Sequence, residues 1–555
     1  MITPVTHEPI SQEHPIAYFS AEFGFDSNVP IYAGGLGILA GDTLKQAADD
    51  GVHMVGVGLL YRGDDMKQAL DATGLQQDED WEFDPVSVGI EHVFVDTLPL
   101  FVSVHLGDDI IWLRVWKKTF GSTVTLYLLD SETDQNTMSE RSNTRMLYSG
   151  SNEYMLKQAM LLGIGGIKVL SAVGIHPSVY HLNEGRPAFL HWQLIRQFMD
   201  FHGVSYQVAT KLAKDKTVYT NHTLVGAANL AFSKSTVAHY ARYYAEKMHI
   251  GADQLLQSGM ESDPNTFHIT RFALNTSNRA NGVSQLHSNL SAQEWPEYHW
   301  SNVTNGVHFP TWQDTEINSA VGDLAHLWNR HCQLKKDLAQ YVQSTTGYTI
   351  HDDWLTIGWA RRLAGYKRLE SLFEDEERLA NIVKRSDRPV QILIAGKAHQ
   401  GDSGGKNMLR GVLERLAGKL SGHALFIPNY QIAIGQQLTR GVDVWLNTPE
   451  QGREACGTSG MKALSNGVLQ CTVADGWAAE VDWPGLGWQL DTNKIAETFY
   501  NLLESEIIPL YYERNAQGIP EGWVKRMQLS IQLAPKFSAH RMLQQYAAQL
   551  YGVPV

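Results

Sequence analysis

The strongest constraint on the fold is a repeated alternation of short apolar runs with helical patterns. In the first half, the apolar runs that end in polar residues cover 16–23, 53–61, 178–185, 217–223 and 302–307. The second half repeats the pattern at 354–362, 389–399, 424–430, 441–447 and 468–477. Strands separated by helices in this way are typical of doubly wound α/β sheets, which bind ligands at the carboxyl ends of the strands. The sequence therefore predicts two Rossmann-like lobes with the active site in the cleft between them.

The lobe boundary is expected near residues 305 and 306. The segment that follows, residues 312–347, has a helical pattern and separates the two sets of strands. The N-terminal lobe would comprise residues 1–305, and the C-terminal lobe residues 306–555. At the end of the chain, Ser538 is a predicted helix cap, and Met542, Tyr546 and Leu550 share one helical face. This pattern predicts a closing helix packed on the body of the C-terminal lobe.

Composition excludes several classes of protein. The chain has 555 residues, of which 43% are hydrophobic and 19% charged, as in globular proteins. The net charge of -14 and the absence of a basic block argue against nonspecific binding of nucleic acid or anionic membranes. The three cysteines are too few and too scattered for a disulfide framework or a four-cysteine zinc site. We therefore expect an enzyme of the reducing cytoplasm without a bound metal.

Two segments bear on export and membranes. The N-terminal stretch MITPVTHEPISQEHP has neither a basic flank nor an apolar run, so we expect no secretory signal. The most apolar stretch, 160–175, is interrupted by Lys168 and glycines, and it is shorter than the roughly 20 apolar residues of a membrane span. It is predicted to be a buried helix.

A glycine-rich turn near residue 457 precedes a lysine. Gly457, Thr458, Ser459 and Gly460 lead into a helical pattern, and Lys462 follows two residues later. Backbone N–H groups at a helix start can bind a phosphate, and a nearby amine can react with an aldehyde. The pair suits pyridoxal phosphate, which carries both groups. The alternative is an ordinary strand-to-helix turn with a surface lysine.

Two further turns are candidate anion sites. ARRLAGYKR places Arg361, Arg362, Lys367 and Arg368 after a predicted strand, a cluster of cations that is costly without an anion. AGGLGILAGD, residues 33–42, has glycines that allow a close approach of the backbone to an anion. A solvated basic loop and a tight turn are the respective alternatives.

Polar residues stand at several predicted strand ends. They are Glu22, Asn183, Glu184, His222 and Asn305. Substrates rich in hydroxyl groups, such as sugars, need many hydrogen-bonding partners of this kind. Each residue taken alone is better explained as a cap or loop residue, and His222 as a structural hydrogen-bonding group.

Taken together, these motifs resemble the α-glucan phosphorylases, the family of glycogen, starch and maltodextrin phosphorylases, and especially its shorter bacterial and archaeal branch. The resemblance runs over roughly 18–480, from AYFSAEFG and AGGLGILAGD through HLNEG, YTNHT and VTNGVHFPTW to ARRLAGYKR and GTSGMKALSNG. It implies a glycosyltransferase B fold with an N-terminal lobe for glucan and phosphate and a C-terminal lobe for pyridoxal phosphate. The implied reaction is phosphorolysis of the terminal α-1,4-linked glucose to glucose 1-phosphate, with retained configuration.

The resemblance also implies site residues, position by position. Catalytic roles fall on Lys462, Arg362, Lys367, His222 and Glu454. The cofactor would be bound by Lys462, Arg361, Gly457, Thr458 and Tyr430. The substrates, a glucan and inorganic phosphate, would contact Gly35, Leu36, Asn183, Glu184, Asn305 and Tyr366. The family is commonly dimeric, so a homodimer is expected.

The sequence departs from the family pattern in three ways. Arg186 stands where the family has histidine, at a position that borders the acceptor sugar, and Cys456 stands where serine is usual. Arg186 would pair with Glu184 or favour an unusual acceptor. The regulatory sites of longer relatives have no recognisable counterpart, so we expect no control of that kind. The alternatives are a nucleotide-sugar glycosyltransferase, which needs no lysine at position 462, and a weakened glucan-binding protein.

Overall fold

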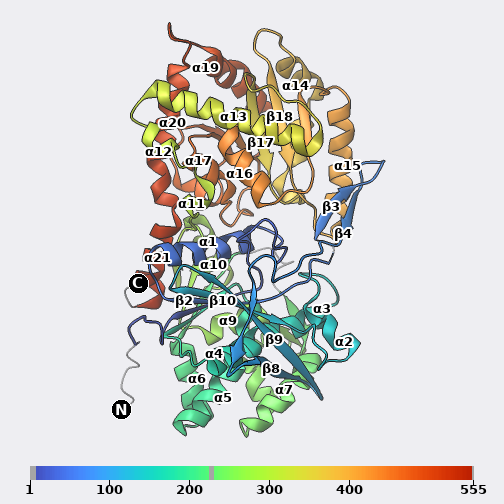
Figure 1. Cartoon of the computed structure of the whole chain (residues 1–555), viewed down its shortest axis with the longest axis vertical. Coiled ribbons are helices and arrows are strands. Elements are labelled where there is room, and N and C mark those ends of the chain that lie inside the picture. The colour runs from blue at the N-terminus through green and yellow to red at the C-terminus, as the bar shows by residue number, and fades with distance from the viewer. Residues whose placement is uncertain (1–7, 65, 224–229, 553–555) are drawn as a thin grey trace. The chain divides into compact units, whose positions relative to one another are not determined.

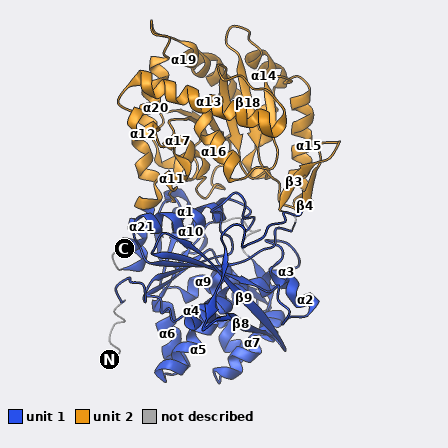
Figure 2. Cartoon of the chain, in the orientation of Figure 1, with its two compact units in different colours: residues 1–64, 80–304, 542–555 blue, residues 65–79, 305–541 orange. Residues whose placement is uncertain are grey.

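The chain forms two compact units that interleave along the sequence (Figure 2). The computed structural model describes residues 8–64, 66–223 and 230–552. The first unit comprises residues 1–64, 80–304 and 542–555, and the second comprises 65–79 and 305–541. Residues 65–79 thus group with the second unit, and residues 542–555 with the first. We predicted a single boundary between Asn305 and Gly306 and placed the closing helix in the C-terminal lobe. Both expectations differ from this division, and both remain predictions about functional domains.

The first unit is built on a mixed sheet with the order β16-β15-β12-β11-β1-β2-β10-β9-β5, and β8 also pairs with β9. Its parallel strands are β1 (Ile16–Ser20), β2 (Met54–Leu59), β11 (Val179–Asn183), β12 (Thr217–Thr220), β15 (Arg279–Gly282) and β16 (Trp300–Asn302). Four of the predicted apolar runs are therefore confirmed as parallel strands. The run 302–307 is not a strand beyond Asn302, because the chain turns there into the loop that precedes α11.

One edge of this sheet was not predicted. β10 (Val124–Asp130) pairs in parallel with β2 but antiparallel with β9 (Asp109–Phe120), which in turn pairs with β8 (Phe101–Leu106) and β5 (Glu91–His92). The antiparallel strands β8 and β9 have one buried face and one more exposed face. Such strands alternate polar and apolar residues, so they lack the continuous apolar runs of buried parallel strands.

Helices cover both sides of the first sheet, with α1 on one side and α4, α5 and α6 on the other (Figure 1). The helices of this unit are α1 (Gly35–Asp49), α2 (Met138–Arg141), α3 (Asn152–Met160), α4 (Gly166–Ala172), α5 (Leu190–His202), α6 (Tyr206–Asp215), α7 (Lys234–Lys247), α8 (Ala252–Leu256), α9 (Ile269–Thr276) and α10 (Gln285–Glu294). A separate pair of strands, β13 (Ala231–Ser233) and β14 (Thr266–His268), and the short hairpin β6 (Phe94–Val95) and β7 (Leu98–Pro99) complete it.

The predicted buried helix at 160–175 is confirmed as part of a longer one. α3, a π-helical turn (Leu161–Gly165) and α4 form one helix, and the backbone of Gly163 packs so closely that a Cβ there would lie 2.4 Å from the Leu190 nitrogen. In the described residues this helix, Asn152–Ala172, is the one long and apolar enough to cross a membrane, but 72% of its apolar window is buried inside the protein. Such burial is typical of a core helix.

The second unit contains an all-parallel sheet with the order β19-β18-β17-β20-β21-β22. Its strands are β17 (Leu355–Ala360), β18 (Val390–Ala395), β19 (Ala424–Ile427), β20 (Val444–Asn447), β21 (Leu469–Val473) and β22 (Trp488–Leu490). All five predicted runs of the second half are confirmed. A separate antiparallel hairpin, β3 (Lys67–Leu70) and β4 (Gln76–Glu79), belongs to the same unit.

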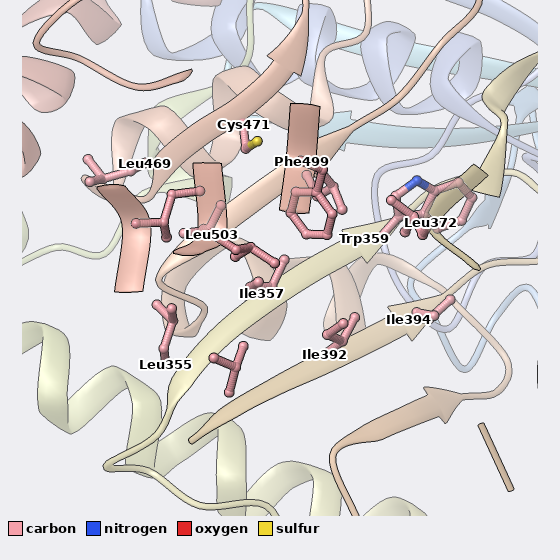
Figure 3. Close-up of a cluster of buried hydrophobic side chains, with 14 of the residues drawn as sticks. Leu355, Ile357, Trp359, Leu372, Ile392, Ile394, Leu469, Cys471, Phe499 and Leu503 are labelled. Carbon is pink, nitrogen blue, oxygen red and sulfur yellow. The ribbon is translucent and has the colours of Figure 1, made fainter. Parts of the chain in front are cut away.

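Both faces of this second sheet are buried. Ile392 and Ile394 of β18 point into one apolar cluster with Ile357 and Phe499 (Figure 3), and Leu393 belongs to a cluster on the other face. The helices are α11 (Phe309–Trp312), α12 (Ile317–Ala320), α13 (Leu324–Thr346), α14 (Glu376–Val383), α15 (Ser403–Ala417), α16 (Ile432–Gly441), α17 (Ser459–Ser465), α18 (Ile495–Leu502), α19 (Ile508–Tyr512) and α20 (Glu521–Leu533). The last helix, α21 (Ala539–Tyr546), begins in this unit and continues into the first. Burial on both faces explains why these strands are continuously apolar.

The predicted cap and apolar face of the last helix are confirmed. The Ser538 hydroxyl accepts a hydrogen bond from the Arg541 N–H group at 3.2 Å. Met542, Tyr546 and Leu550 are all buried. The first seven residues, part of the N-terminal stretch for which we expected no secretory signal, lie outside the described residues.

Candidate active site

The glycine turn of the first unit lies between β1 and α1. Helix α1 begins at Gly35, and its N-cap, Gly34, provides no capping side chain. The first N–H groups of a helix have no acceptors within it, so those of Gly35 and Leu36 are placed to bind an anion. The Glu22 carboxylate, just beyond β1, holds the turn by accepting hydrogen bonds from the N–H groups of Ala33 at 2.5 Å and Gly34 at 3.2 Å.

The ends of β11 and β12 bring Asn183, Glu184 and His222 together. The His222 Nε2 atom lies 2.5 Å from Oδ1 of Asn183, and the His222 backbone N–H group donates to the Glu184 carboxylate at 2.9 Å. The Tyr219 hydroxyl donates to the other carboxylate oxygen of Glu184, also at 2.9 Å. Glu184 adopts a left-handed backbone conformation, with φ of 74°, which these contacts hold in place. Three predicted residues thus form one hydrogen-bonded group.

Burial sets the charge of this group. It lowers the pKa of His222 to about 3, with His287 and His181 adding to the effect, so the imidazole is neutral at pH 7. Burial also raises the pKa of Glu184 to about 7, against the hydrogen bonds from His222 and Tyr219 that favour its charged form. At pH 7, His222 therefore presents a neutral imidazole, whereas Glu184 is divided between its neutral and charged forms.

The raised pKa of Glu184 predicts a pH-dependent stability. Because the folded protein holds this proton more tightly than the unfolded chain, stability is highest below the unfolded pKa and falls as the pH rises toward 7. The Glu184→Gln variant should lose this component, worth up to about 3 kcal/mol. The measurement is the free energy of unfolding from denaturant titrations between pH 4.5 and 8. Exposed Glu246→Gln is the control, and identical slopes for wild type and Glu184→Gln would contradict the prediction.

Of the two alternatives expected for Arg186, a preference for an unusual acceptor stays a prediction, whereas no ion pair with Glu184 is found among the described residues. Arg186 instead contacts Tyr148 and Met155. Its guanidinium lies over the Tyr148 ring, 4.5 Å from the centroid, and donates to the Met155 sulfur at 3.6 Å. The Tyr148 hydroxyl in turn donates to Glu22 at 3.0 Å. The Glu184 carboxylate already accepts hydrogen bonds from three other donors. The Arg186 cation instead interacts with the face of the Tyr148 ring.

In the second unit, two buried cations share one buried carboxylate. The Glu454 carboxylate accepts a hydrogen bond from Lys367 Nζ, and the Arg361 guanidinium lies 3.5 Å from the same oxygen. Although burial alone would raise it, Lys367 and then Arg361 hold the pKa of Glu454 below its usual range. Arg361 also donates to the Asn447 side chain at the end of β20. The cluster carries an excess of positive charge in a site from which water is largely excluded.

Lys462 lies on α17 beside an aromatic pocket. Its ammonium nitrogen is 3.6 Å from the centroid of the Trp312 ring, and the residue is only 7% exposed. Nearby, Gly435 of α16 lets two aromatic side chains approach closely: a Cβ there would lie 3.2 Å from the Tyr430 hydroxyl and 3.4 Å from the Trp312 ring. The Tyr430 hydroxyl is also within electrostatic reach of Arg361, which opposes the rise that burial causes in its pKa. The lysine and the cation cluster are therefore connected through Trp312 and Tyr430.

The other predicted residues of this unit surround the same cluster. Gly457 has φ of 83°, and a side chain there would press on Glu454. Thr458 is the N-cap residue of α17, and its carbonyl accepts the Lys462 N–H group. The Tyr366 ring lies 4.6 Å from the Lys367 ammonium group. Arg362, in contrast, is exposed.

Among the buried polar atoms that have no hydrogen-bond partner in the described part of the chain, two belong to predicted site residues. They are Nε of Arg361 and Oδ1 of Asn305, in residues that are 7% and 4% exposed. Buried polar atoms are nearly always paired, and an unpaired one indicates a ligand or an ordered water. A guanidinium nitrogen suits an anion, and an amide oxygen suits a hydroxyl group.

Several contact residues were not predicted as site residues. Trp312 beneath Lys462, Asn447 on Arg361 and Tyr219 on Glu184 all hold predicted residues in place. Each falls within one of the motifs or predicted strands, namely VTNGVHFPTW, the run 441–447 and YTNHT. For Asn447 and Tyr219 the available signal was position at or near a strand end, whereas Trp312 lies at the end of α11. The partner of each residue, however, is distant in sequence and could not be deduced.

Comparison with known proteins identifies a family that fits this arrangement. The model of the carbohydrate phosphorylase family matches residues 317–483. The maltodextrin phosphorylase of Thermococcus litoralis is 35% identical over 97% of this chain and 71% of its own length. The glycogen phosphorylases of Mycobacterium tuberculosis and Aquifex aeolicus are 34% and 32% identical, each over 97% of this chain, and are covered over 70% and 86% of their lengths. The chain therefore belongs to the carbohydrate phosphorylase family.

Proposed function

We propose that the protein is an α-glucan phosphorylase that transfers the terminal glucose of a maltodextrin or glycogen chain to inorganic phosphate, giving glucose 1-phosphate with retained configuration. The observation that carries this proposal is the pair of buried cations, Lys367 and Arg361, that shares the single carboxylate of Glu454. Two buried positive charges with one negative partner favour a bound anion. A phosphate ion is an anion of the required size and charge.

The same residues fit pyridoxal phosphate. Lys462 would hold its aldehyde carbon, Arg361 and Thr458 its phosphate, and Tyr430 would line its pocket. The fit rests on the buried amine over Trp312 and on the unpaired Nε of Arg361. When bound, the cofactor would supply a phosphate group that exchanges a proton with inorganic phosphate.

The remaining residues would bind and orient the substrates. The backbone N–H groups of Gly35 and Leu36, with Arg362 and Lys367, would bind inorganic phosphate and stabilise its negative charge. Around the transferred glucose, hydroxyl groups would be bound by Asn183, Glu184, His222, Asn305, Tyr366, Glu454 and Gly457. Because His222 is neutral at pH 7, it would orient a hydroxyl group by hydrogen bonding rather than act as an imidazolium acid. Assembly as a homodimer in the cytoplasm, without nucleic-acid or membrane partners, is part of the same proposal.

The direct test is incubation of the purified protein with maltodextrin and inorganic phosphate, followed by detection of glucose 1-phosphate. The expected product appears only when both substrates are present. A parallel reaction with nucleotide-activated glucose and maltodextrin tests the nucleotide-sugar alternative. Free glucose, transfer from the nucleotide sugar, or no product at all would overturn the proposal.

Arg186 predicts a change in acceptor preference. The Arg186→His variant replaces a charged group over the Tyr148 ring with a shorter side chain that can be neutral. It should raise kcat/KM for plain maltodextrins by roughly threefold to tenfold, since about 1 kcal/mol separates a well-packed from a poorly packed polar contact. The KM for phosphate should stay unchanged. The measurement is the kinetics of phosphorolysis and of the reverse synthesis over a series of acceptor lengths.

Arg196→His is a matched control for this variant. Arg196 also lies over a tyrosine ring of the first unit, Tyr243, at 5.8 Å from its centroid. It should leave the kinetics of the whole acceptor series unchanged. Equal efficiencies of wild type and Arg186→His over that series would show that Arg186 does not influence the acceptor.

A further inference from the structure

The β3–β4 hairpin belongs to the second unit, although the residues on either side of it belong to the first. Its two buried polar side chains are Gln68 and Gln76, which are 4% and 2% exposed. They are hydrogen-bonded to each other, from Nε2 of Gln68 to Oε1 of Gln76, at 2.8 Å. Burying an amide is costly unless its donors and acceptors are all satisfied, so the other partners of these two glutamines show what the hairpin holds.

The first partner is the loop after β18, residues 396–398. Gln76 contacts Ala398 twice: its Nε2 donates to the carbonyl at 2.9 Å, and its Oε1 accepts from the N–H group at 3.0 Å. Gln68 donates from Nε2 to the carbonyl of Gly396 at 3.0 Å. The Lys397 ammonium group donates to the Met66 carbonyl at 3.0 Å. Each residue of the 396–398 loop is therefore bonded to the hairpin.

This loop in turn supports the backbone of the turn that carries Arg361 and Arg362, residues 361–363, which we call the arginine turn. The Arg361 N–H group donates to the carbonyl of Ala395 at 3.2 Å, and the Leu363 N–H group donates to the carbonyl of Lys397 at 2.9 Å. The two segments also touch closely, since a Cβ at Gly396 would lie 2.1 Å from the Arg361 carbonyl oxygen. A shift of the 396–398 loop would therefore move the turn that carries Arg361 and Arg362.

The second partner is the loop after β19. Oε1 of Gln68 accepts a hydrogen bond from the Asn429 N–H group at 2.7 Å. Asn429 has a left-handed conformation, with φ of 57°, and directly precedes Tyr430. A backbone in this conformation persists only where its surroundings hold it. Gln68 thus links the loop of Tyr430 to the loop that supports Arg361.

We propose that Gln68 and Gln76 are positioning residues. Through the 396–398 loop and Asn429 they hold the arginine turn and Tyr430 in place, without touching a substrate themselves. The inference rests on the proposed function, in which Arg361, Arg362 and Tyr430 serve the phosphates of substrate and cofactor. An anion contact depends on the placement of the guanidinium groups, so a displaced turn weakens phosphate binding more than glucan binding.

The test compares Gln68→Met and Gln76→Met with Gln77→Met. Methionine keeps the volume of glutamine but removes the hydrogen bonds, and Gln77 is an exposed neighbour of Gln76 on the same strand, bonded only within the hairpin in the described structure. In both hairpin variants the KM for inorganic phosphate should rise roughly tenfold, which corresponds to the loss of about one hydrogen bond. The KM for maltodextrin should stay within about twofold, and Gln77→Met should resemble wild type.

Amide hydrogen exchange of the same variants gives a second measurement that needs no activity. Faster exchange at residues 361–363, 396–398 and 429–430 supports the inference, and unchanged exchange there overturns it. Equal increases in both KM values would also overturn it, because they would indicate a general loss of structure. If the wild-type protein forms no glucose 1-phosphate, the proposed function fails, and the exchange data alone then decide the positioning role. Gln68→Met keeps the paired bonds of Gln76 to Ala398 and serves if Gln76→Met does not fold.

Discussion

Lys462→Ala is expected to abolish stable retention of pyridoxal phosphate and to lower the rate of glucose 1-phosphate formation by roughly a thousandfold or more, about 4 kcal/mol of transition-state stabilisation. The buried Lys462 amine over the Trp312 ring is placed to hold the cofactor covalently. Alanine removes the amine and leaves a cavity beside the aromatic ring. Phosphate contacts from Arg361 and Thr458 alone would let the cofactor exchange with solvent.

The experiment measures the cofactor released on denaturation, by its absorbance, alongside the phosphorolysis rate. Lys494→Ala is the control, because the Lys494 side chain is 62% exposed and pairs with Glu497 on the surface of the same unit. The control should retain both the cofactor and the activity. A Lys462→Ala protein that keeps a full complement of cofactor, or a wild type that takes up none on reconstitution, would refute the role of this lysine.

Glu454→Gln should be the second most damaging substitution. The carboxylate is the acidic partner of Lys367 and lies 3.5 Å from Arg361, so its loss leaves two buried cations facing a neutral amide. Breaking a buried ion pair on one side costs about 3 to 5 kcal/mol. We expect the free energy of unfolding at pH 7 to fall by an amount of this order, and kcat/KM for maltodextrin to fall on the order of a hundredfold, since the glucose contact is lost as well.

The pH dependence separates this effect from general damage. Because the pKa of Glu454 is depressed in the folded protein, its contribution to stability is complete above the unfolded pKa and is lost as the pH falls through the folded pKa. The difference in unfolding free energy between wild type and variant should therefore shrink in acid. Glu450→Gln, whose side chain is 49% exposed and pairs with Arg453, is the control. A difference that does not depend on pH would show that Glu454 acts only through its shape.

The central parallel strands were predictable because burial on both faces makes them continuously apolar. The strands from Leu355 to Ala360 and from Val390 to Ala395 were found for this reason. The short strands β15 (Arg279–Gly282) and β22 (Trp488–Leu490) were not predicted. The antiparallel edge at β8 and β9 was missed, since its residues alternate between buried and more exposed positions. The β3–β4 hairpin was missed as well, because nothing in its own sequence indicates that it groups with residues more than 300 positions away.

For the candidate site, residue types were easier to predict than partners. ARRLAGYKR indicated an anion site because clustered cations repel one another unless an anion is bound between them. GTSGMK indicated a phosphate-binding turn followed by a lysine. The expected contact of Glu454 with a sugar remains a prediction, whereas its bonds to Lys367 and Arg361 were not anticipated. Nor could the sequence pair Lys462 with Trp312, since 150 positions separate them and only the packing of α11 against α17 joins them.

The interleaving of the two units determines the order in which the chain can fold during synthesis. Proteins with several domains usually complete the N-terminal one first, as it leaves the ribosome. Here the first unit includes residues 542–552, whose Tyr551 hydroxyl lies 2.9 Å from Nδ1 of the buried His181 and whose Leu550 carbonyl accepts a bond from Arg279. The first unit therefore cannot be completed until after the second has been synthesised. A fragment that ends at residue 305 would emerge with the His181 side of its sheet uncovered, and would depend on chaperones or on the missing segment supplied as a peptide.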